Sequence, residues 1–357
     1  MMRSAVFMGR DFVRQRCLCA DYQPVYRWFS GAASGSGKLG QNGVNSRIPF
    51  RDDLETTLNT KPFFRDDLVR WQQLISPHWL HSLLAGDEVM AAPTGNWRLF
   101  EVDFGAPDAY EQSHIPGAAY LDTHCLEDGP LWNKVADDLL LQLLLDIGIR
   151  HDTTVILYSR NMAAAARAAH LMLYAGVEDV RLLDGGFDAW QRAGLPCAAG
   201  APQSYPSATE FGVPFPGNPH FMTDLHQAHA LLLQPGGALV SIRSWDEFTG
   251  KTSGYSYIQA KGDISGALWG HAGSSVGADV NDMSAFHRPD GTLLPVSDIL
   301  QFWRQEGIHA DLQTAFYCGT GWRASLAFYY AWLMGWDNIS VYDGGWFEWS
   351  QSCFAQQ

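Results

Sequence analysis

Two stretches of the chain repeat the same order of apolar and polar segments. In each, a short apolar run predicts a buried strand, an alanine-rich run predicts a helix, and a further apolar run predicts a second strand. These three elements fall at residues 154–159, 163–175 and 179–183, and again at residues 314–318, 324–334 and 338–342. An Asp-Gly-Gly turn follows each copy, and the distance from Ser159 to Asp184 and from Cys318 to Asp343 is 25 residues in both. The chain therefore contains an internal repeat.

The repeat extends toward the N-terminus. Residues 114–118 (HIPGA) correspond to residues 263–267 (DISGA), and an apolar run that predicts a strand precedes each of them. The second copy holds about ten more residues than the first, near residues 270–288. Strands that alternate with helices of this length predict βαβ units and a parallel sheet that is covered by helices on both faces. The fold class that the sequence predicts is α/β.

The length of 357 residues suits two domains and an additional segment. A Pro/Gly-rich stretch at residues 199–219 predicts a linker between the two copies. The domains are then residues 76–198 and 220–355. Residues 61–75 are interpreted as a second linker, and residues 1–60 as a basic, Gly/Ser-rich arm that we expect to be poorly ordered.

Charge and composition exclude several classes of partner. The chain has 24 Lys and Arg against 38 Asp and Glu, a net charge of −14, so we expect no binding to nucleic acid. No apolar run reaches the length of about 18 residues that a membrane-spanning helix needs. The apolar patch near the N-terminus is too short for a signal peptide, which favours a cytoplasmic location. The six cysteines show no zinc-type spacing, so no metal site is expected.

Cys318 lies at the carboxyl end of a predicted strand, where parallel sheets gather their functional groups. Gly319 and Gly321 allow the backbone after it to curl with its N–H groups pointing inward. The helix that follows and Arg323 both bring positive charge, so we expect the thiol pKa to lie below its ordinary value of about 8.5. The pattern predicts an anion-binding loop around a thiolate nucleophile; the alternative is a buried, inert cysteine.

Residues 318–325 (CGTGWRAS) resemble the C-x-x-G-x-R-[AS]-S loop of rhodanese sulfurtransferases, and the HIPGA segment and the DGGF and DGGW turns are also typical of rhodanese domains. The resemblance covers both copies. It implies two rhodanese-like domains, each with a mainly parallel five-stranded sheet and helices on both faces. It also leaves a periplasmic location open.

The resemblance further implies a covalent mechanism that needs no metal or cofactor. The Cys318 thiolate would attack the outer sulfur of thiosulfate or a similar donor, expel sulfite, and hold a persulfide that a thiophilic acceptor such as cyanide or a thiol then collects. The backbone amides of the loop would stabilise the persulfide anion. The loop residues are Gly319, Thr320, Gly321, Trp322 and Arg323.

The first copy carries Ser159 at the position that corresponds to the cysteine. A serine hydroxyl needs a general base to become nucleophilic, and it cannot form a persulfide. We therefore expect the first domain to be non-catalytic and to wall the cleft.

Two residues outside the loop are possible substrate contacts. Arg243 follows a predicted strand, where it would bind donor oxyanions, brace the catalytic loop or form a surface ion pair. His271 lies in the additional residues of the second copy and would border the cleft, or it is an ordinary loop histidine.

Two other functions fit the same loop. One is a persulfide carrier between a cysteine desulfurase and a biosynthetic acceptor, for example in molybdenum-cofactor sulfuration. The other is a cysteine-dependent phosphatase, which resembles C-x5-R; four residues separate Cys318 from Arg323 here, so this reading is the weaker one.

Overall fold

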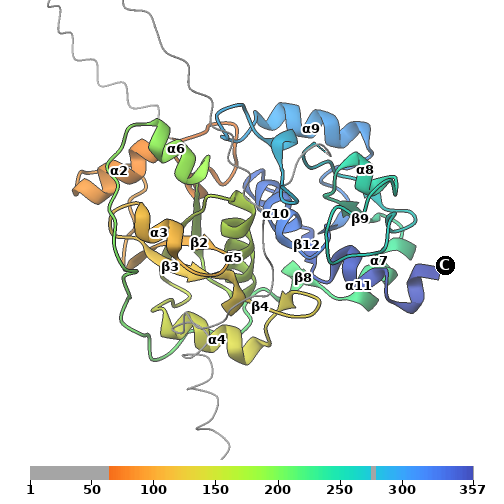
Figure 1. Ribbon diagram of the computed structural model, residues 1–357, viewed down its shortest axis with the longest axis horizontal. Helices are drawn as coiled ribbons and strands as arrows, with labels where there is room; N and C mark the ends of the chain where they lie inside the picture. Colours follow the sequence, from red (N-terminus) through yellow and green to blue (C-terminus); the bar gives the residue numbers. More distant parts are fainter. Residues whose placement is uncertain (1–63, 275–278, 357) are drawn as a thin grey trace, which may run out of the picture.

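The computed structural model describes residues 64–274 and 279–356. Within them the first domain contains a parallel sheet of five strands in the order β1-β7-β6-β2-β3 (Figure 1). The expected arm at residues 1–60 lies outside the described residues. The strands are β1 (Leu74–Ile75), β2 (Trp97–Asp103), β3 (Ala119–Asp122), β6 (Thr154–Tyr158) and β7 (Asp179–Leu183).

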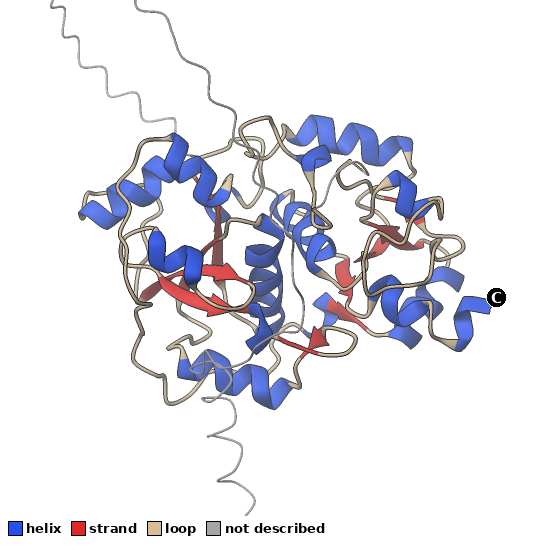
Figure 2. Cartoon of the chain, viewed as in Figure 1, coloured by secondary structure: helices blue, strands red, loops and turns tan. Residues whose placement is uncertain are grey.

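Helices cover both faces of this first sheet (Figure 2). One face packs against α2 (Pro77–Ala85), α3 (Asp108–Gln112) and α6 (Gly186–Arg192), and the other against α4 (Asp137–Asp146) and α5 (Met162–Ala175). A short antiparallel hairpin, β4 (Glu127–Asp128) and β5 (Asn133–Lys134), lies outside the sheet. The sequence pattern did not indicate this hairpin.

The second domain repeats the arrangement within the described residues, with five parallel strands in the order β10-β9-β11-β12-β8. The strands are β8 (Met222–Thr223), β9 (Gly237–Ser241), β10 (Leu268–Trp269), β11 (Gln313–Tyr317) and β12 (Ile339–Tyr342). The helices are α7 (Leu225–Leu233), α8 (Trp245–Phe248), α9 (Val296–Gln305), α10 (Trp322–Leu333) and α11 (Gly345–Trp349). Numbered along the chain, both sheets place their strands in the order first, fifth, fourth, second, third, which confirms the predicted fold class.

The two domains share one apolar core, because α5 and α10 pack against each other at the centre of the molecule (Figure 1). Both helices are almost wholly buried. Asn161 caps the N-terminus of α5, and its side chain accepts a hydrogen bond from Ala163 N; Gly176, which has a φ of +106°, caps the C-terminus. The alanines of α5 allow a close approach of the helices, so the loop at the start of α10 is held against the first domain.

The prediction of a linker at residues 61–75 is wrong for its last two residues. Leu74 and Ile75 form the edge strand β1, which pairs with β7, because both side chains are apolar and are buried against the sheet. The linker at residues 199–219 runs along the first domain instead of hanging free. The Tyr205 hydroxyl accepts a hydrogen bond from Leu99 N at 3.0 Å, and its ring packs on Phe100.

Across residues 64–274 and 279–356, no helix is both long enough and apolar enough to cross a lipid bilayer.

Candidate functional site

Cys318 follows directly after β11 and is fully buried. The backbone curls around its sulfur, and Gly321 N lies 3.2 Å from the Sγ atom and donates a hydrogen bond to it. Gly321 has a φ of +107°, which disfavours any side chain, and it caps the N-terminus of α10. The sulfur therefore faces a backbone N–H group at the positive end of a buried helix.

A glycine is needed at position 319 because the Tyr255 ring lies close to its backbone, and not because of its φ angle. A Cβ atom at this position would lie 2.3 Å from the ring of Tyr255, so no larger residue fits. The Tyr255 ring thus packs on the loop immediately after Cys318. Burial holds the pKa of Tyr255 well above its usual range. Tyr257 forms a hydrogen bond with Thr320, and burial raises the pKa of Tyr257 to about 12. Both tyrosines therefore remain protonated at neutral pH.

The second Asp-Gly-Gly turn shapes the loop from the other side. At the start of α11, Trp346 N donates to the carbonyl of Cys318 at 2.8 Å, and Phe347 N donates to the carbonyl of Gly319 at 3.1 Å. Gly345 has a φ of +53°, and a Cβ atom there would lie 2.6 Å from the carbonyl oxygen of Cys318. These hydrogen bonds occupy the carbonyl groups of the loop. The loop therefore presents N–H donors, and not carbonyl acceptors, to an anion at the sulfur.

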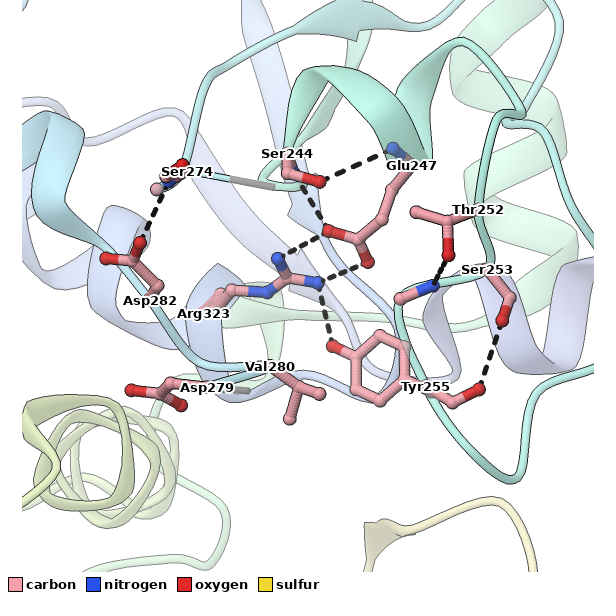
Figure 3. Close-up of a pocket in the computed structure, with 12 residues that line it drawn as sticks. Ser244, Glu247, Thr252, Ser253, Tyr255, Ser274, Asp279, Val280, Asp282 and Arg323 are labelled. Carbon is pink, nitrogen blue, oxygen red and sulfur yellow. Dashed lines mark hydrogen bonds and ion pairs between the residues drawn. The ribbon is translucent and has the colours of Figure 1, made fainter. Parts of the chain in front are cut away.

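Arg323 is buried and paired, whereas the sequence pattern predicts a charge that is available to the thiolate. Its Nη1 and Nη2 atoms donate to the two carboxylate oxygens of Glu247 at 2.8 and 2.9 Å, and Nη2 also donates to the Tyr255 hydroxyl at 2.9 Å (Figure 3). A buried guanidinium without a counter-charge would be costly, which explains the bidentate pair. Burial raises the pKa of Glu247, but Arg323 and Arg243 outweigh it and lower that pKa to about 2.

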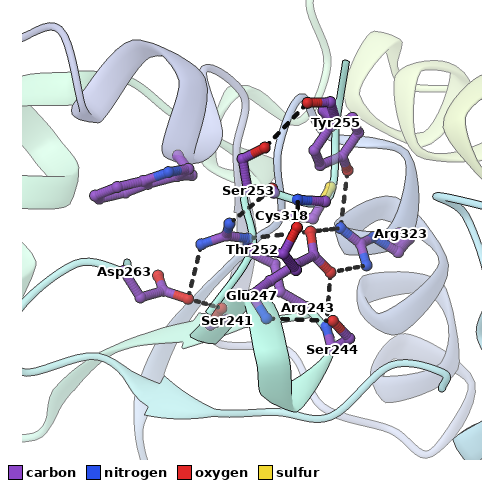
Figure 4. Close-up of polar contacts among 12 residues, drawn as sticks. Ser241, Arg243, Ser244, Glu247, Thr252, Ser253, Tyr255, Asp263, Cys318 and Arg323 are labelled. Atoms are coloured by element: carbon purple, nitrogen blue, oxygen red, sulfur yellow. Dashed lines mark hydrogen bonds and ion pairs between the residues drawn. The ribbon is translucent and has the colours of Figure 1, made fainter. Parts of the chain in front are cut away.

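Arg243 is fully buried, and its Nε atom lies 3.5 Å from Glu247 (Figure 4). Its Nη1 donates to the carbonyl of Gly262 at 2.7 Å and contacts Asp263 at 3.1 Å, and its Nη2 donates to the carbonyl of Ser253 at 3.2 Å. These partners belong to the segment that carries Tyr255. The geometry corresponds to a residue that braces the site rather than to a surface ion pair.

His271 packs against Trp269 and α9. Its ring stacks on Trp269 with centroids 3.7 Å apart, and it also contacts Phe302 of α9. Its Nε2 atom is 3.6 Å from Glu306, and burial lowers its pKa. The structure therefore places His271 against α9.

A polar pocket of about 260 Å³ lies beside Arg323 and Tyr255 (Figure 3). Among its described lining residues, Arg323 is the one cationic side chain, and it is neutralised by Glu247. Cys318 is not among the residues that line this pocket, so the pocket lies next to the Arg323 pair and not at the sulfur. The lining residues are Ser244, Glu247, Thr252, Ser253, Gly254, Tyr255, Gly273, Ser274, Asp279, Val280, Asp282 and Arg323.

The first domain contacts the Cys318 loop at Trp322. The indole Nε1 donates to Glu127 Oε2 of β4 at 2.9 Å, and the indole ring lies 6.3 Å from the ring of Phe104. Phe104 in turn contacts His124 and Trp132, with centroid distances of 4.0 and 5.9 Å. Four aromatic rings from both domains thus gather beside the loop.

The corresponding loop of the first domain has a different shape. Ser159 is buried, its hydroxyl donates to the carbonyl of Asn161 at 2.5 Å, and it accepts from Asn161 N at 2.8 Å. The Arg160 guanidinium binds Glu101 and backbone carbonyls instead of facing the serine. The hydroxyl is therefore occupied by its own turn, which supports the expectation of a non-catalytic first domain.

The aspartates of the two Asp-Gly-Gly turns bind across the domain interface. Asp184 accepts from Leu293 N of the second domain at 2.8 Å, and Asp343 accepts from Lys134 N of the first domain at 2.7 Å. Burial raises the pKa of Asp184 to about 6. The repeated turns thus clamp the domains together reciprocally.

Within the described part of the chain, no group of three or more His, Cys, Asp or Glu side chains is placed to hold a metal ion.

Comparison with known families settles what this architecture is. The model of the rhodanese-like domain matches residues 76–193 and again residues 224–352. The chain belongs to the rhodanese-like family. It carries two copies of the domain, and this confirms the resemblance that the loop and the turns indicated.

Several curated proteins match most of this chain. The chain is 54% identical over 291 residues to the thiosulfate sulfurtransferase YnjE of Escherichia coli; the match covers 82% of this chain and 66% of that protein. The crystal structure of YnjE superposes with a TM-score of 0.77. The sulfur carrier protein TtuD of Thermus thermophilus is 31% identical over 77% of this chain and 93% of its own length.

A further solved structure is that of an anaerobic ergothioneine biosynthesis enzyme from Chlorobium limicola in complex with trimethyl histidine. The sequence of the Chlorobium enzyme is 37% identical to this one. The match covers 80% of this chain and 69% of the Chlorobium enzyme, and the TM-score is 0.76.

Sequence reasoning brought Cys318 and residues 319–323 together correctly in space but missed their partners. Glu247 and Tyr255 bind Arg323 from positions far along the chain, and Glu127 comes from the other domain. The Ser-x-x-Glu capping box at Ser244 and Glu247 was a local signal, but it indicates a helix start rather than an arginine partner.

Proposed function

We propose that the protein is a sulfurtransferase that moves sulfane sulfur from thiosulfate, or a similar donor, to a thiophilic acceptor such as cyanide or a thiol. The observation that carries the proposal is the loop itself. The Gly321 N–H group points at the Cys318 sulfur at 3.2 Å, while the loop carbonyls bind to α11. The identity with a thiosulfate sulfurtransferase over most of the chain supports the same chemistry.

The reaction has two displacement steps at sulfur. The Cys318 thiolate attacks the outer sulfur of thiosulfate, the S–S bond of the donor breaks, and sulfite leaves with the bonding electron pair. The acceptor then attacks the terminal sulfur of the persulfide, the bond to Sγ breaks, and the thiolate is regenerated. The persulfide anion occupies the place where the Gly321 amide and the end of α10 supply positive charge.

Steady-state release of sulfite and thiocyanate from thiosulfate and cyanide tests this assignment. Cys318→Ser should abolish both products, and Ser159→Ala should leave both rates unchanged, because Ser159 lies in the turn of the first domain. Activity that survives in Cys318→Ser would place the chemistry elsewhere.

A persulfide carrier is the alternative that the relatives also support, since TtuD is a sulfur carrier protein. In this role Cys318 would receive sulfur from a cysteine desulfurase and pass it to a biosynthetic acceptor, for example in molybdenum-cofactor sulfuration. Incubation with a desulfurase and cysteine, followed by mass measurement, distinguishes the roles. The absence of any mass gain on Cys318 would argue against the carrier.

The aromatic cluster beside the loop favours one particular small acceptor. Phe104, His124, Trp132 and Trp322 form a cluster of aromatic rings, and aromatic rings bind quaternary ammonium groups. Trimethyl histidine, which the Chlorobium relative binds, carries such a group. Transfer of the persulfide sulfur into an imidazole C–H bond would give a thiol and return the Cys318 thiol. Failure of the persulfide-loaded protein to convert trimethyl histidine would remove this acceptor.

Phosphatase chemistry is weakened by the placement of Arg323. Cysteine-dependent phosphatases use this arginine to clamp the phosphate, but here Glu247 already holds both of its terminal nitrogens. We expect no release of phosphate from an aryl phosphate.

A further inference from the structure

A buried ionic network that crosses the domain interface lies beneath the catalytic loop. Arg167 of α5 contacts Glu127 of β4 through Nε at 2.7 Å and Asp343, which follows β12, through Nη2 at 2.6 Å. The side chains of Arg167 and Glu127 are 0% and 2% exposed, and that of Asp343 is 9% exposed. Two of the three charges therefore come from the first domain, which carries Ser159 at the position that corresponds to Cys318.

The network touches the catalytic loop at two adjacent residues. At Gly321, a Cβ atom would lie 3.2 Å from Arg167 Nη1 and 3.4 Å from its Cζ atom, so the guanidinium packs directly on this glycine. At Trp322, the indole donates to the second carboxylate oxygen of Glu127. Gly321 is the residue whose amide faces the Cys318 sulfur. A shift of the network is therefore transmitted to the donor that the persulfide would use.

Burying three charged groups is expensive, and a well-packed apolar cluster in the same place would give equal or greater stability. The charged groups that face Glu127 are Arg167 from α5 and Asp343 from the turn after β12. Trp322 from α10 is a neutral donor, and the Tyr257 phenol, which also interacts with Glu127, is protonated at neutral pH. Burial raises the pKa of Glu127 to about 7, against the opposing influence of Arg167. The charge of Glu127, and with it the ion pair to Arg167, therefore changes near neutral pH.

We propose that Glu127 and Arg167 of the first domain are positioning residues for sulfur transfer, which fix Gly321 and Trp322 so that the loop amide stays aimed at the Cys318 sulfur. This inference rests on the proposed function of Cys318. It gives the first domain a specific role in the reaction, in addition to lining the cleft.

The experiment compares two isosteric variants of buried glutamates in the first domain. Glu127→Gln keeps an acceptor for Trp322 and removes the charge. The control is Glu101→Gln, since Glu101 is also buried and pairs with Arg160 at 2.9 Å, but it lies at the loop of Ser159. The quantity measured is the single-turnover rate at which thiosulfate adds one sulfur to Cys318, followed by mass spectrometry of quenched samples across a pH series.

We expect Glu127→Gln to load sulfur about tenfold more slowly than wild type at about pH 8, where Glu127 is ionised. The ratio should approach one at about pH 5.5, because a protonated glutamate resembles glutamine. Glu101→Gln should match wild type at every pH. Arg167→Lys, which keeps the charge but loses the planar contact on Gly321, should also be slower wherever it folds.

Equal loading rates of wild type and Glu127→Gln across the pH series would overturn the inference, and so would a defect that does not depend on pH. A wild-type protein that takes no sulfur on Cys318 would instead refute the proposed function, so the two failures are distinguishable. Thermal unfolding of each variant shows whether a rate change reflects loss of the fold.

Discussion

The pairing of Arg323 with Glu247 leads to a stability prediction that does not depend on any substrate. Glu247→Gln preserves the shape of the side chain but leaves the buried guanidinium without its counter-charge. The pKa of Glu247 falls from 4.5 to about 2, and a difference of this size corresponds to about 3 kcal/mol of stabilisation. We expect the free energy of unfolding to fall by about this amount, which lies within the range of about 3 to 5 kcal/mol for a broken buried ion pair.

The assay is urea unfolding followed by tryptophan fluorescence, with Asp246→Asn as the matched control. Asp246 is on the same helix and pairs with Lys251 at 2.7 Å, but the lysine is largely exposed, so this pair should contribute less than about 1 kcal/mol. A Glu247→Gln protein that unfolds at the same urea concentration as wild type would refute the reasoning about Arg323.

The same pair predicts how stability depends on pH. Because the pKa of Glu247 is lowered in the folded state, its contribution is complete above the unfolded pKa near 4.5 and is lost as the pH falls toward 2. The stability gap between wild type and Glu247→Gln should therefore narrow over this interval. A gap of constant size from pH 7 down to about pH 2 would contradict the assigned charge state.

Two further substitutions test the loop and the domain clamp. Gly319→Ala should slow sulfur loading by at least about tenfold, because the added methyl group would overlap the Tyr255 ring. Gly95→Ala is the control and should load sulfur at the wild-type rate, because the space around Gly95 is open. Equal loading rates of the two variants would contradict the packing of Tyr255 on Gly319. Asp184→Asn keeps the acceptor for Leu293 N and removes a carboxylate whose pKa burial raises to about 6. Thermal unfolding should show that the variant is about 1 to 3 kcal/mol more stable than wild type at pH 8, and that this gain shrinks as the pH falls below 6. A variant that is less stable than wild type at pH 8 would contradict the effect assigned to burial of Asp184.

The fold and the position of the Cys318 loop were predictable because their signals are local. The alternation of strands and helices lies within each copy, and the loop from Cys318 to Arg323 is continuous in sequence. A strand end, two glycines and a helix start are enough to indicate where an anion would bind. Sulfur transfer at Cys318 itself stays a prediction until it is measured.

The partners of the loop were not predictable because they depend on packing between distant segments. Nothing in the sequence near Arg323 shows that Glu247 neutralises it, or that Arg243 lies behind both. The network of Glu127 and Arg167 is harder still, since it exists only when α5 and α10 bring the domains together. An isolated arginine in an alanine-rich helix is in itself an ambiguous signal.

The most direct test of the account is the mass of the Cys318 peptide after the protein is treated with thiosulfate. The account predicts a gain of one sulfur atom on Cys318 and its loss when cyanide is added. The free cysteines Cys197 and Cys353 are exposed and provide internal controls that should stay unmodified. No gain on Cys318, or a gain on an exposed cysteine instead, would contradict the central claim.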